Sequence, residues 1–215
     1  MANGTYPLDI RGELAAPSRG WWLLKWLLGI PHFIILFFLY IGYAFVWIIT
    51  LFAILFTGKH PKWAFDYKLG VLRWSWRVGF YTYSALGTDK YPPFSLDPDP
   101  AYPADLDMPY TEKMSRGLVV VKWWLLAIPH YIITGIFTSG GGGVLWDMGN
   151  KANAEGGLGL IYWLVIISAI ALLFTGKYPQ SIFKLVIGFN RWVYRVAAYV
   201  SLMTDEYPPF RLWDD

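Results

Sequence analysis

The chain has 215 residues, of which 56% are hydrophobic, 20% aromatic and only 15% charged, whereas an average soluble domain carries about 25% charged residues. Its net charge of +3 is spread along the chain without a basic stripe, so we expect no nucleic-acid partner. The absence of cysteine excludes disulfides, thiolate metal sites and cysteine nucleophiles. Thirteen tryptophans are typical of a protein that meets a membrane–water interface.

Six short motifs occur twice in the same order, which indicates a tandem duplication. The pairs are Y-P at residues 6–7 and 102–103, S-R-G at 18–20 and 115–117, I-P-H at 30–32 and 128–130, L-F-T-G-K-x-P at 55–61 and 173–179, G-x-x-R-W-x-x-R at 70–77 and 188–195, and T-D-x-Y-P-P-F at 88–94 and 204–210. We therefore expect two membrane repeats, residues 1–98 and 99–215, with a glycine-rich insertion at residues 138–159 of the second.

The first apolar run covers residues 21–56, and no signal-type cleavage site follows it, so we expect it to be retained. Its length fits a hairpin of two membrane spans that turns at residues 40–43, or one long tilted helix. The second repeat favours the hairpin, because its apolar runs at 117–137 and 160–174 are separated by the insertion. Glycines and charges of that kind cannot lie in hydrocarbon as exposed backbone.

The third segment of each repeat predicts an amphipathic helix, with arginines on one stripe and aromatic residues on the other. Arg73 and Arg77 form one i,i+4 pair, and Arg191 and Arg195 form the other. Two roles are open for them: binding lipid phosphates, or fixing the depth of the helix by snorkelling. We expect Trp74 and Trp192 to act as interface anchors under either role.

Together these elements predict an all-α integral membrane protein of two tandem repeats, each a transmembrane hairpin plus an amphipathic Arg- and Trp-rich helix. Four spans with both termini in the cytoplasm would put most cations on one side. These cations are Arg11, Arg19, Lys25, Lys59, Lys62, Arg116, Lys122 and Lys177. Spanning third helices, with the second repeat inverted, remain an alternative.

Short stretches outside the apolar runs alternate apolar and polar residues, at residues 6–10 and 102–108. This pattern predicts brief extended segments. The proline-rich acidic segment at 97–107 is interpreted as a solvated linker or as a partner for the arginine stripes, with cation binding as the less favoured alternative.

The motif series, taken in both repeats, resembles the bacterial membrane family called domain of unknown function 4389. The resemblance covers nearly the whole chain and implies a membrane protein without an established catalytic activity. The repeats differ at one charged position of the third segment, where Asp66 of the first is matched by Lys184 of the second.

His32 and His130 are candidates for intramembrane polar roles, because each follows a proline inside an apolar run. Each proline removes a donor from a carbonyl four residues earlier, near Leu27 and Leu125, and the histidines could repair that loss or hydrogen-bond between helices. They could instead ligate a metal, haem or pigment, relay a proton, or lie among the headgroups.

The Y-P-P-F sequence ends each repeat, and its double proline cannot continue a helix. It is interpreted as a helix stop that lays its aromatic side chains on the interface, or as a docking strip for another protein. The residues are Tyr91, Pro92, Pro93 and Phe94, and then Tyr207, Pro208, Pro209 and Phe210. The glycine of L-F-T-G-K is interpreted as a helix C-cap, since the Gly-x-x-x-x-Gly-Lys frame of a phosphate loop is missing.

No catalytic constellation is present in the sequence, so we expect a non-catalytic protein without cofactor or metal. The leading hypothesis is an accessory or scaffold subunit of the bacterial inner membrane that packs against lipids and other membrane proteins. One alternative is a small carrier or lipid-handling protein whose cavity lies between the repeats. Another is an electron-transfer or pigment subunit that binds a cofactor through the two histidines.

Overall fold

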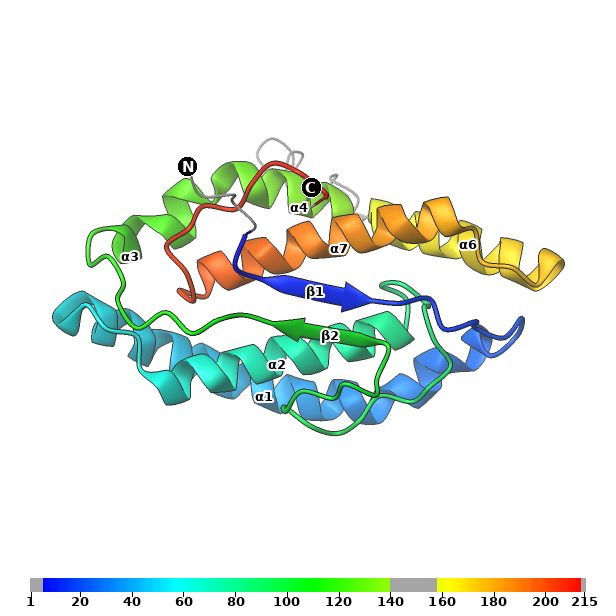
Figure 1. Ribbon diagram of the computed structural model, residues 1–215, viewed down its shortest axis with the longest axis horizontal. Coiled ribbons are helices and arrows are strands. Elements are labelled where there is room, and N and C mark those ends of the chain that lie inside the picture. Colours follow the sequence, from blue (N-terminus) through cyan, green and yellow to red (C-terminus); the bar gives the residue numbers. More distant parts are fainter. Residues whose placement is uncertain (1–5, 140–157, 214–215) are drawn as a thin grey trace, which may run out of the picture.

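A computed structural model describes residues 6–139 and 158–213. Its elements, in chain order, are β1 (Asp9–Gly12), α1 (Trp22–Thr57), α2 (Lys62–Tyr81), β2 (Ala104–Asp107), α3 (Leu118–Val121), the π-helical turn η1 (Lys122–Leu126), α4 (Ile128–Ser139), α6 (Leu160–Thr175) and α7 (Gln180–Val200). They form three layers: a two-stranded sheet, then α2 and α7, then an outer layer of α1, α4 and α6 (Figure 1).

The two strands pair antiparallel, with Ile10 opposite Leu106. They confirm the prediction of extended segments and correct the expectation of an all-α fold. Both side chains are buried against the middle layer. Gly12, at the end of β1, lies close to the middle layer: a Cβ there would lie 2.9 Å from Ile187 Cδ1 and 3.0 Å from Phe80 Cε2.

The first apolar run is one continuous helix of 36 residues, so the predicted hairpin with a turn at residues 40–43 is wrong. That stretch contains no proline, and its single glycine serves another purpose. A Cβ at Gly42 would lie 2.5 Å from the Tyr67 hydroxyl of α2, whose O–H donates to the Leu39 carbonyl at 2.8 Å. Gly42 therefore permits close packing of α2 on α1 rather than a turn.

Chain reversal occurs instead at the glycine of L-F-T-G-K. Gly58 and Gly176 have left-handed backbone conformations, with φ of 71° and 69°, and cap α1 and α6. Each N–H donates to a carbonyl in the last helical turn, at 2.8 Å in both repeats. The predicted C-cap is confirmed, because glycine adopts positive φ without steric cost.

In the second repeat, α4 and α6 follow one another along one edge of the molecule and correspond to the two halves of α1 (Figure 1). The end of α4 meets the start of α6, since a Cβ at Gly159 would lie 2.3 Å from the backbone of Thr138. They continue in one direction rather than folding back as the predicted pair of spans. The insertion falls at the position equivalent to Gly42, and its residues 140–157 lie outside the described residues.

A one-residue difference between the repeats explains the π-helical turn. K-W-L-L-G-I-P-H in the first repeat becomes K-W-W-L-L-A-I-P-H in the second, which has one extra tryptophan between lysine and histidine. The π-turn η1 lies across this insertion, at Lys122–Leu126. A π-turn absorbs one additional residue without ending a helix, so Lys122 and His130 keep the contacts that Lys25 and His32 make.

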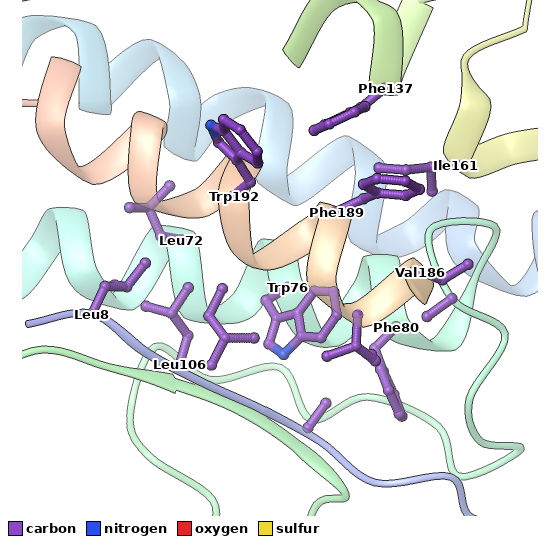
Figure 2. Close-up of a cluster of buried hydrophobic side chains, with 14 of the residues drawn as sticks. Leu8, Leu72, Trp76, Phe80, Leu106, Phe137, Ile161, Val186, Phe189 and Trp192 are labelled. Carbon is purple, nitrogen blue, oxygen red and sulfur yellow. The ribbon is translucent and has the colours of Figure 1, made fainter. Parts of the chain in front are cut away.

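The two repeats share one hydrophobic core and exchange their first segments. Side chains from both repeats meet between the layers, among them Trp76, Phe80, Phe189 and Trp192 (Figure 2). Tyr6 of the first repeat donates to the Arg195 carbonyl at 3.2 Å, and Tyr102 of the second donates to the Arg77 carbonyl at 3.4 Å. A boundary at residue 98 therefore separates the two copies in the sequence. In the structure, the first segment of each repeat packs against the third helix of the other.

Among the described residues, α1 alone is by itself long and apolar enough to cross a membrane, and most of its side chains are exposed. The segments Leu118–Leu126 and Ile128–Ser139 would make a second span if joined, although they are bent by 45°. By length and composition, α1 fits a membrane span or a signal sequence. The predicted four spans have no support in this part of the chain.

Candidate functional site

The repeated motifs meet in two matching cages, each built around one histidine. The first cage surrounds His32 of α1, whose ring is fully buried. Phe94 stacks on the ring at 4.0 Å between centroids, Tyr91 lies at 4.8 Å, and Trp74 of α2 donates its indole N–H to His32 Nδ1 at 3.0 Å. The motifs I-P-H, R-W and Y-P-P-F therefore supply the side chains of one cage.

The second cage repeats this geometry around His130 of α4. Trp192 of α7 donates to His130 Nδ1 at 3.0 Å, Phe210 stacks at 4.5 Å, and Tyr207 lies at 4.9 Å. The two histidines belong to helices at opposite edges of the molecule (Figure 1). They do not form the shared pair that a bridging cofactor would need.

The tryptophan contact fixes the proton of each histidine. An indole N–H only donates, so Nδ1 of His32 and of His130 must accept, and a neutral ring then carries its proton on Nε2. A metal or haem iron needs a free lone pair on the ligating nitrogen. In this tautomer neither ring nitrogen has a free lone pair. The structure instead shows one of the predicted roles of the histidines, which is a hydrogen bond between helices.

The Y-P-P-F strips turn inward as well as outward. Tyr91 donates to the Leu28 carbonyl at 3.0 Å, and Tyr207 donates to the Leu126 carbonyl at 3.1 Å. These carbonyls lie one residue beyond the predicted ones, and the tyrosines rather than the histidines supply the extra donor. Phe94 and Phe210 stay 50% and 55% exposed, so the predicted docking strip keeps an accessible edge.

A buried lysine beside each cage holds the T-D part of the closing motif. Lys25 lies 2.9 Å from Asp89 and donates to the Thr88 carbonyl at 2.6 Å. Lys122 does the same with Asp205 at 2.8 Å and with the Thr204 carbonyl at 2.9 Å. These lysines were interpreted only as cytoplasmic charges, and their recurrence at the same place in both repeats is the signal that could have revealed the pairs.

The Asp89 carboxylate also closes the S-R-G turn, by accepting the Ser18 backbone N–H at 2.6 Å. Burial acts to raise the pKa of Asp89, but hydrogen bonds from Ser18 and Lys25 outweigh it and lower the pKa below its ordinary value. The ionised carboxylate is therefore the form that the fold stabilises.

Arg73 and Arg77 face the sheet, contrary to a lipid-facing role. Arg73 donates to the Leu106 carbonyl at 2.8 Å and to Asp107 at 2.9 Å. Arg77, which is fully buried, donates to Asp105 at 3.0 Å and to the Asp97 carbonyl at 2.8 Å. A phosphate could reach the two guanidinium groups only if those contacts opened. The acidic segment at 97–107 is therefore the partner of Arg73 and Arg77, and these two arginines do not support the lipid-phosphate hypothesis.

The same motif on α7 receives the C-terminal segment. Arg191 donates to the Leu212 carbonyl at 3.4 Å, and Arg195 donates to the Arg211 carbonyl at 3.0 Å. The glycine three residues before the first arginine admits this segment, because a Cβ at Gly188 would lie 3.2 Å from Leu212, and one at Gly70 would lie 2.7 Å from Leu96. In each repeat, G-x-x-R-W-x-x-R is thus the face of the third helix on which a later segment of the same chain docks.

His60 and Lys68 form a buried pair that exists only in the first repeat. His60 Nδ1 donates to the Pro61 carbonyl at 3.0 Å, so its Nε2 accepts from Lys68 at 3.0 Å. Burial first, and then the Lys68 charge, lower the pKa of His60 to about 3. Burial together with the Lys122 charge holds the pKa of Lys68 well below its ordinary value.

We expect this pair to make stability depend on pH. His60 has a depressed folded-state pKa, so its contribution is present above the ordinary pKa of about 6.5 and is lost as the pH falls toward 3. Replacing His60 by Tyr and Lys68 by Val copies Tyr178 and Val186 of the second repeat, where the Tyr178 hydroxyl donates to the Ala85 carbonyl. Thermal unfolding in detergent at pH 6.5 and 4 should show the wild type losing up to about 3 kcal/mol more than the double variant. Equal losses would contradict this account of His60.

A cavity of about 430 Å³ lies along α1 and α2 of the first repeat, with Tyr162 of the second repeat in its lining. Its lining is mainly apolar and aromatic, with Phe37 and Tyr40 from α1, Ser75 from α2 and Tyr162 from α6. A smaller cavity of about 220 Å³ shares Tyr40 and Tyr162 and continues against α7. Among residues 6–139 and 158–213, no group of three or more metal-ligating side chains is present.

These features define a mostly helical protein of two repeats, closed by paired histidine cages and buried ion pairs. The chain belongs to the family described as Domain of unknown function (DUF4389), whose model matches residues 20–95 and 157–211, more than half of the chain. The two matched segments are consistent with two tandem copies, as the resemblance implied. The second match begins after α4, so the equivalence of His130 with His32 rests on the geometry above. No curated protein and no solved structure matches the chain.

Proposed function

We propose that this protein is a non-catalytic accessory or scaffold protein of the bacterial inner membrane, which packs its apolar outer layer against lipids and other membrane proteins. The observation that carries the proposal is the row of exposed large apolar side chains on α1. They include Phe37, Phe38 and Phe45, which are 62%, 64% and 64% exposed. Such a row on a helix whose only charged side chain, Lys25, is buried marks a surface that meets lipid or protein.

The side-chain pairs that recur in the two repeats support a structural role. Each repeated ionisable motif is occupied by another part of the same chain: histidine by tryptophan, lysine by aspartate, and the first arginine pair by two aspartates. Side chains so occupied stabilise an architecture and leave few groups for acid–base or nucleophilic chemistry.

Alkaline extraction of bacterial membranes tests the proposal. We expect the tagged wild-type chain to stay with the membrane after a carbonate wash, and the variant Phe38→Glu/Phe45→Glu to be released or degraded. Lys113→Glu, at an exposed side chain outside the helices, is the matched control and should behave as wild type. A wild-type chain that remains in solution as a compact monomer would contradict membrane attachment, and capture that repeatedly returns the protein alone would count against an accessory role.

A second candidate, binding of a lipid chain, is favoured by the cavity along α1 and α2. Its volume lies within the range of about 300–1,000 Å³ that small ligands occupy. Phe33 and Phe37 line it and are themselves exposed on the outer layer, so a chain could enter from lipid. Native mass spectrometry would show retained lipid in wild type and less in Ser75→Phe, which fills the cavity; equal lipid in both would reject this site.

A further inference from the structure

Building on the proposed membrane attachment, we infer that the outer layer lies flat in one leaflet of the bilayer, with α1, α4 and α6 along the membrane plane and the sheet in water. The surface concerned is the face of these three helices that points away from α2 and α7. Its partner is the acyl region of a single leaflet. The arrangement of the layers distinguishes this in-plane orientation from one in which α1 spans the bilayer.

Charge is distributed unevenly between the layers. Within α1 the only charged side chain is Lys25, which is buried and paired with Asp89, and α4 and α6 contain none. The sheet side carries exposed acids, among them Asp9 and Asp107, whose side chain is 74% exposed. One side of the molecule is therefore uncharged and the other is charged along its length.

The charged sheet lies level with the middle of α1. The Tyr40 hydroxyl, near the centre of α1, meets the Ser75 hydroxyl of α2 at 2.8 Å. Two residues from Ser75, Arg73 holds Asp107 at 2.9 Å. If α1 stood across the bilayer with its centre at the midplane, exposed Asp107 would lie at that depth as well, where an exposed charge is strongly disfavoured.

The two repeats run in opposite directions along the long axis. The start of α3 lies at the end of α1, where Arg116 approaches Gly58, and the start of α1 lies at the end of α6, where Arg19 approaches Gly176. Exposed cations therefore occur at both ends of the long axis, at Lys59 and at Lys177. Only an in-plane orientation puts both ends on the same side, as the preference for cytoplasmic cations requires.

The length of α1 agrees with this orientation. A helix of 36 residues is about 54 Å long, whereas the hydrocarbon core is about 30 Å thick. Apolar side chains are exposed along all of it, from Trp26 to Phe56. An interfacial helix buries its apolar face about 5–10 Å deep whatever its length, so the whole row can be covered by lipid.

Labelling of single cysteines tests the orientation, because the chain has none of its own. Gly20→Cys and Gly117→Cys are matched positions at opposite ends of the long axis, and a Cβ at either glycine meets no atom within 4 Å. An impermeant maleimide is added to intact inner-membrane vesicles of either sidedness, and a carbonate wash follows the labelling. We expect both cysteines to be labelled from the cytoplasmic side only.

Labelling of the two cysteines from opposite sides would overturn the in-plane orientation while leaving membrane attachment intact. Loss of the protein from the washed vesicles would instead overturn the proposed function and this inference with it. Asp107→Cys, on the sheet, serves as an internal reference for the aqueous side and should be labelled together with the other two. Protection of Asp107→Cys from both sides would also contradict the inference, because the sheet would then be covered by a second copy or by another protein.

Discussion

Replacing Asp89 by Ala is expected to lower the free energy of unfolding in detergent by about 3 kcal/mol, since the loss of one partner of a buried ion pair leaves a charge without compensation. The charge left behind is Lys25, whose side chain is 1% exposed. Its remaining contacts are the Thr88 carbonyl at 2.6 Å and the Tyr81 ring. The Ser18 turn loses its acceptor at the same time. The start of α1 and the closing motif of the repeat then separate.

A double-mutant cycle with Lys25→Met isolates the pair. The double variant should be more stable than Asp89→Ala alone, because no unpaired charge remains in it. Asp205→Ala is the equivalent change in the second repeat and should have a similar effect. Asp66→Ala is the control, since its pair with Lys62 is exposed and should contribute less than about 0.5 kcal/mol. A loss of that small size for Asp89→Ala would contradict the assignment.

Replacing Arg77 by Met is expected to cost about 3 kcal/mol or more and to loosen the sheet. Arg77 is fully buried, and its guanidinium ties the Asp97 carbonyl and Asp105 to α2. Methionine keeps much of the volume but offers no donor, so Asp105, whose side chain is only 16% exposed, loses a charge partner. Because Asp105 lies opposite Arg11 in the register of the two strands, the effect should reach β1.

Hydrogen exchange measured by mass spectrometry gives the local readout. In Arg77→Met the amides of β1 and β2 should exchange faster than in wild type, while those of α6 stay protected. Exchange in Arg77→Lys should be intermediate, because lysine keeps the charge but lacks the planar guanidinium that reaches both acceptors. Unchanged exchange in the strands would mean that Arg77 does not hold the sheet on α2.

The sequence predicted those features that depend on neighbouring residues. Glycine followed by lysine at the end of an apolar run predicted the caps at Gly58 and Gly176, and alternation predicted the strands. The duplication was evident because six motifs recur in order. Each of these patterns is complete within a few residues, so local propensity decides the outcome.

The contacts that hold the molecule together were harder to predict, because they join residues far apart in the chain. Lys25 meets the carbonyl of a residue 63 positions away, and Trp74 meets a histidine 42 positions away. The hairpin error has a different cause. An apolar run carries no period that separates one helix from two, and Gly42 was interpreted as a turn although it permits the approach of Tyr67.

The central claim is that one face of the molecule lies in lipid while the opposite face, at the same level along α1, lies in water. Nitroxide labels at Phe38 and Asp107 of the reconstituted protein test it most directly, by comparing relaxation by oxygen with relaxation by a water-soluble nickel chelate. The account predicts strong oxygen and weak nickel contact at Phe38, and the reverse at Asp107. Equal nickel contact at both positions, or oxygen contact at both, would contradict it.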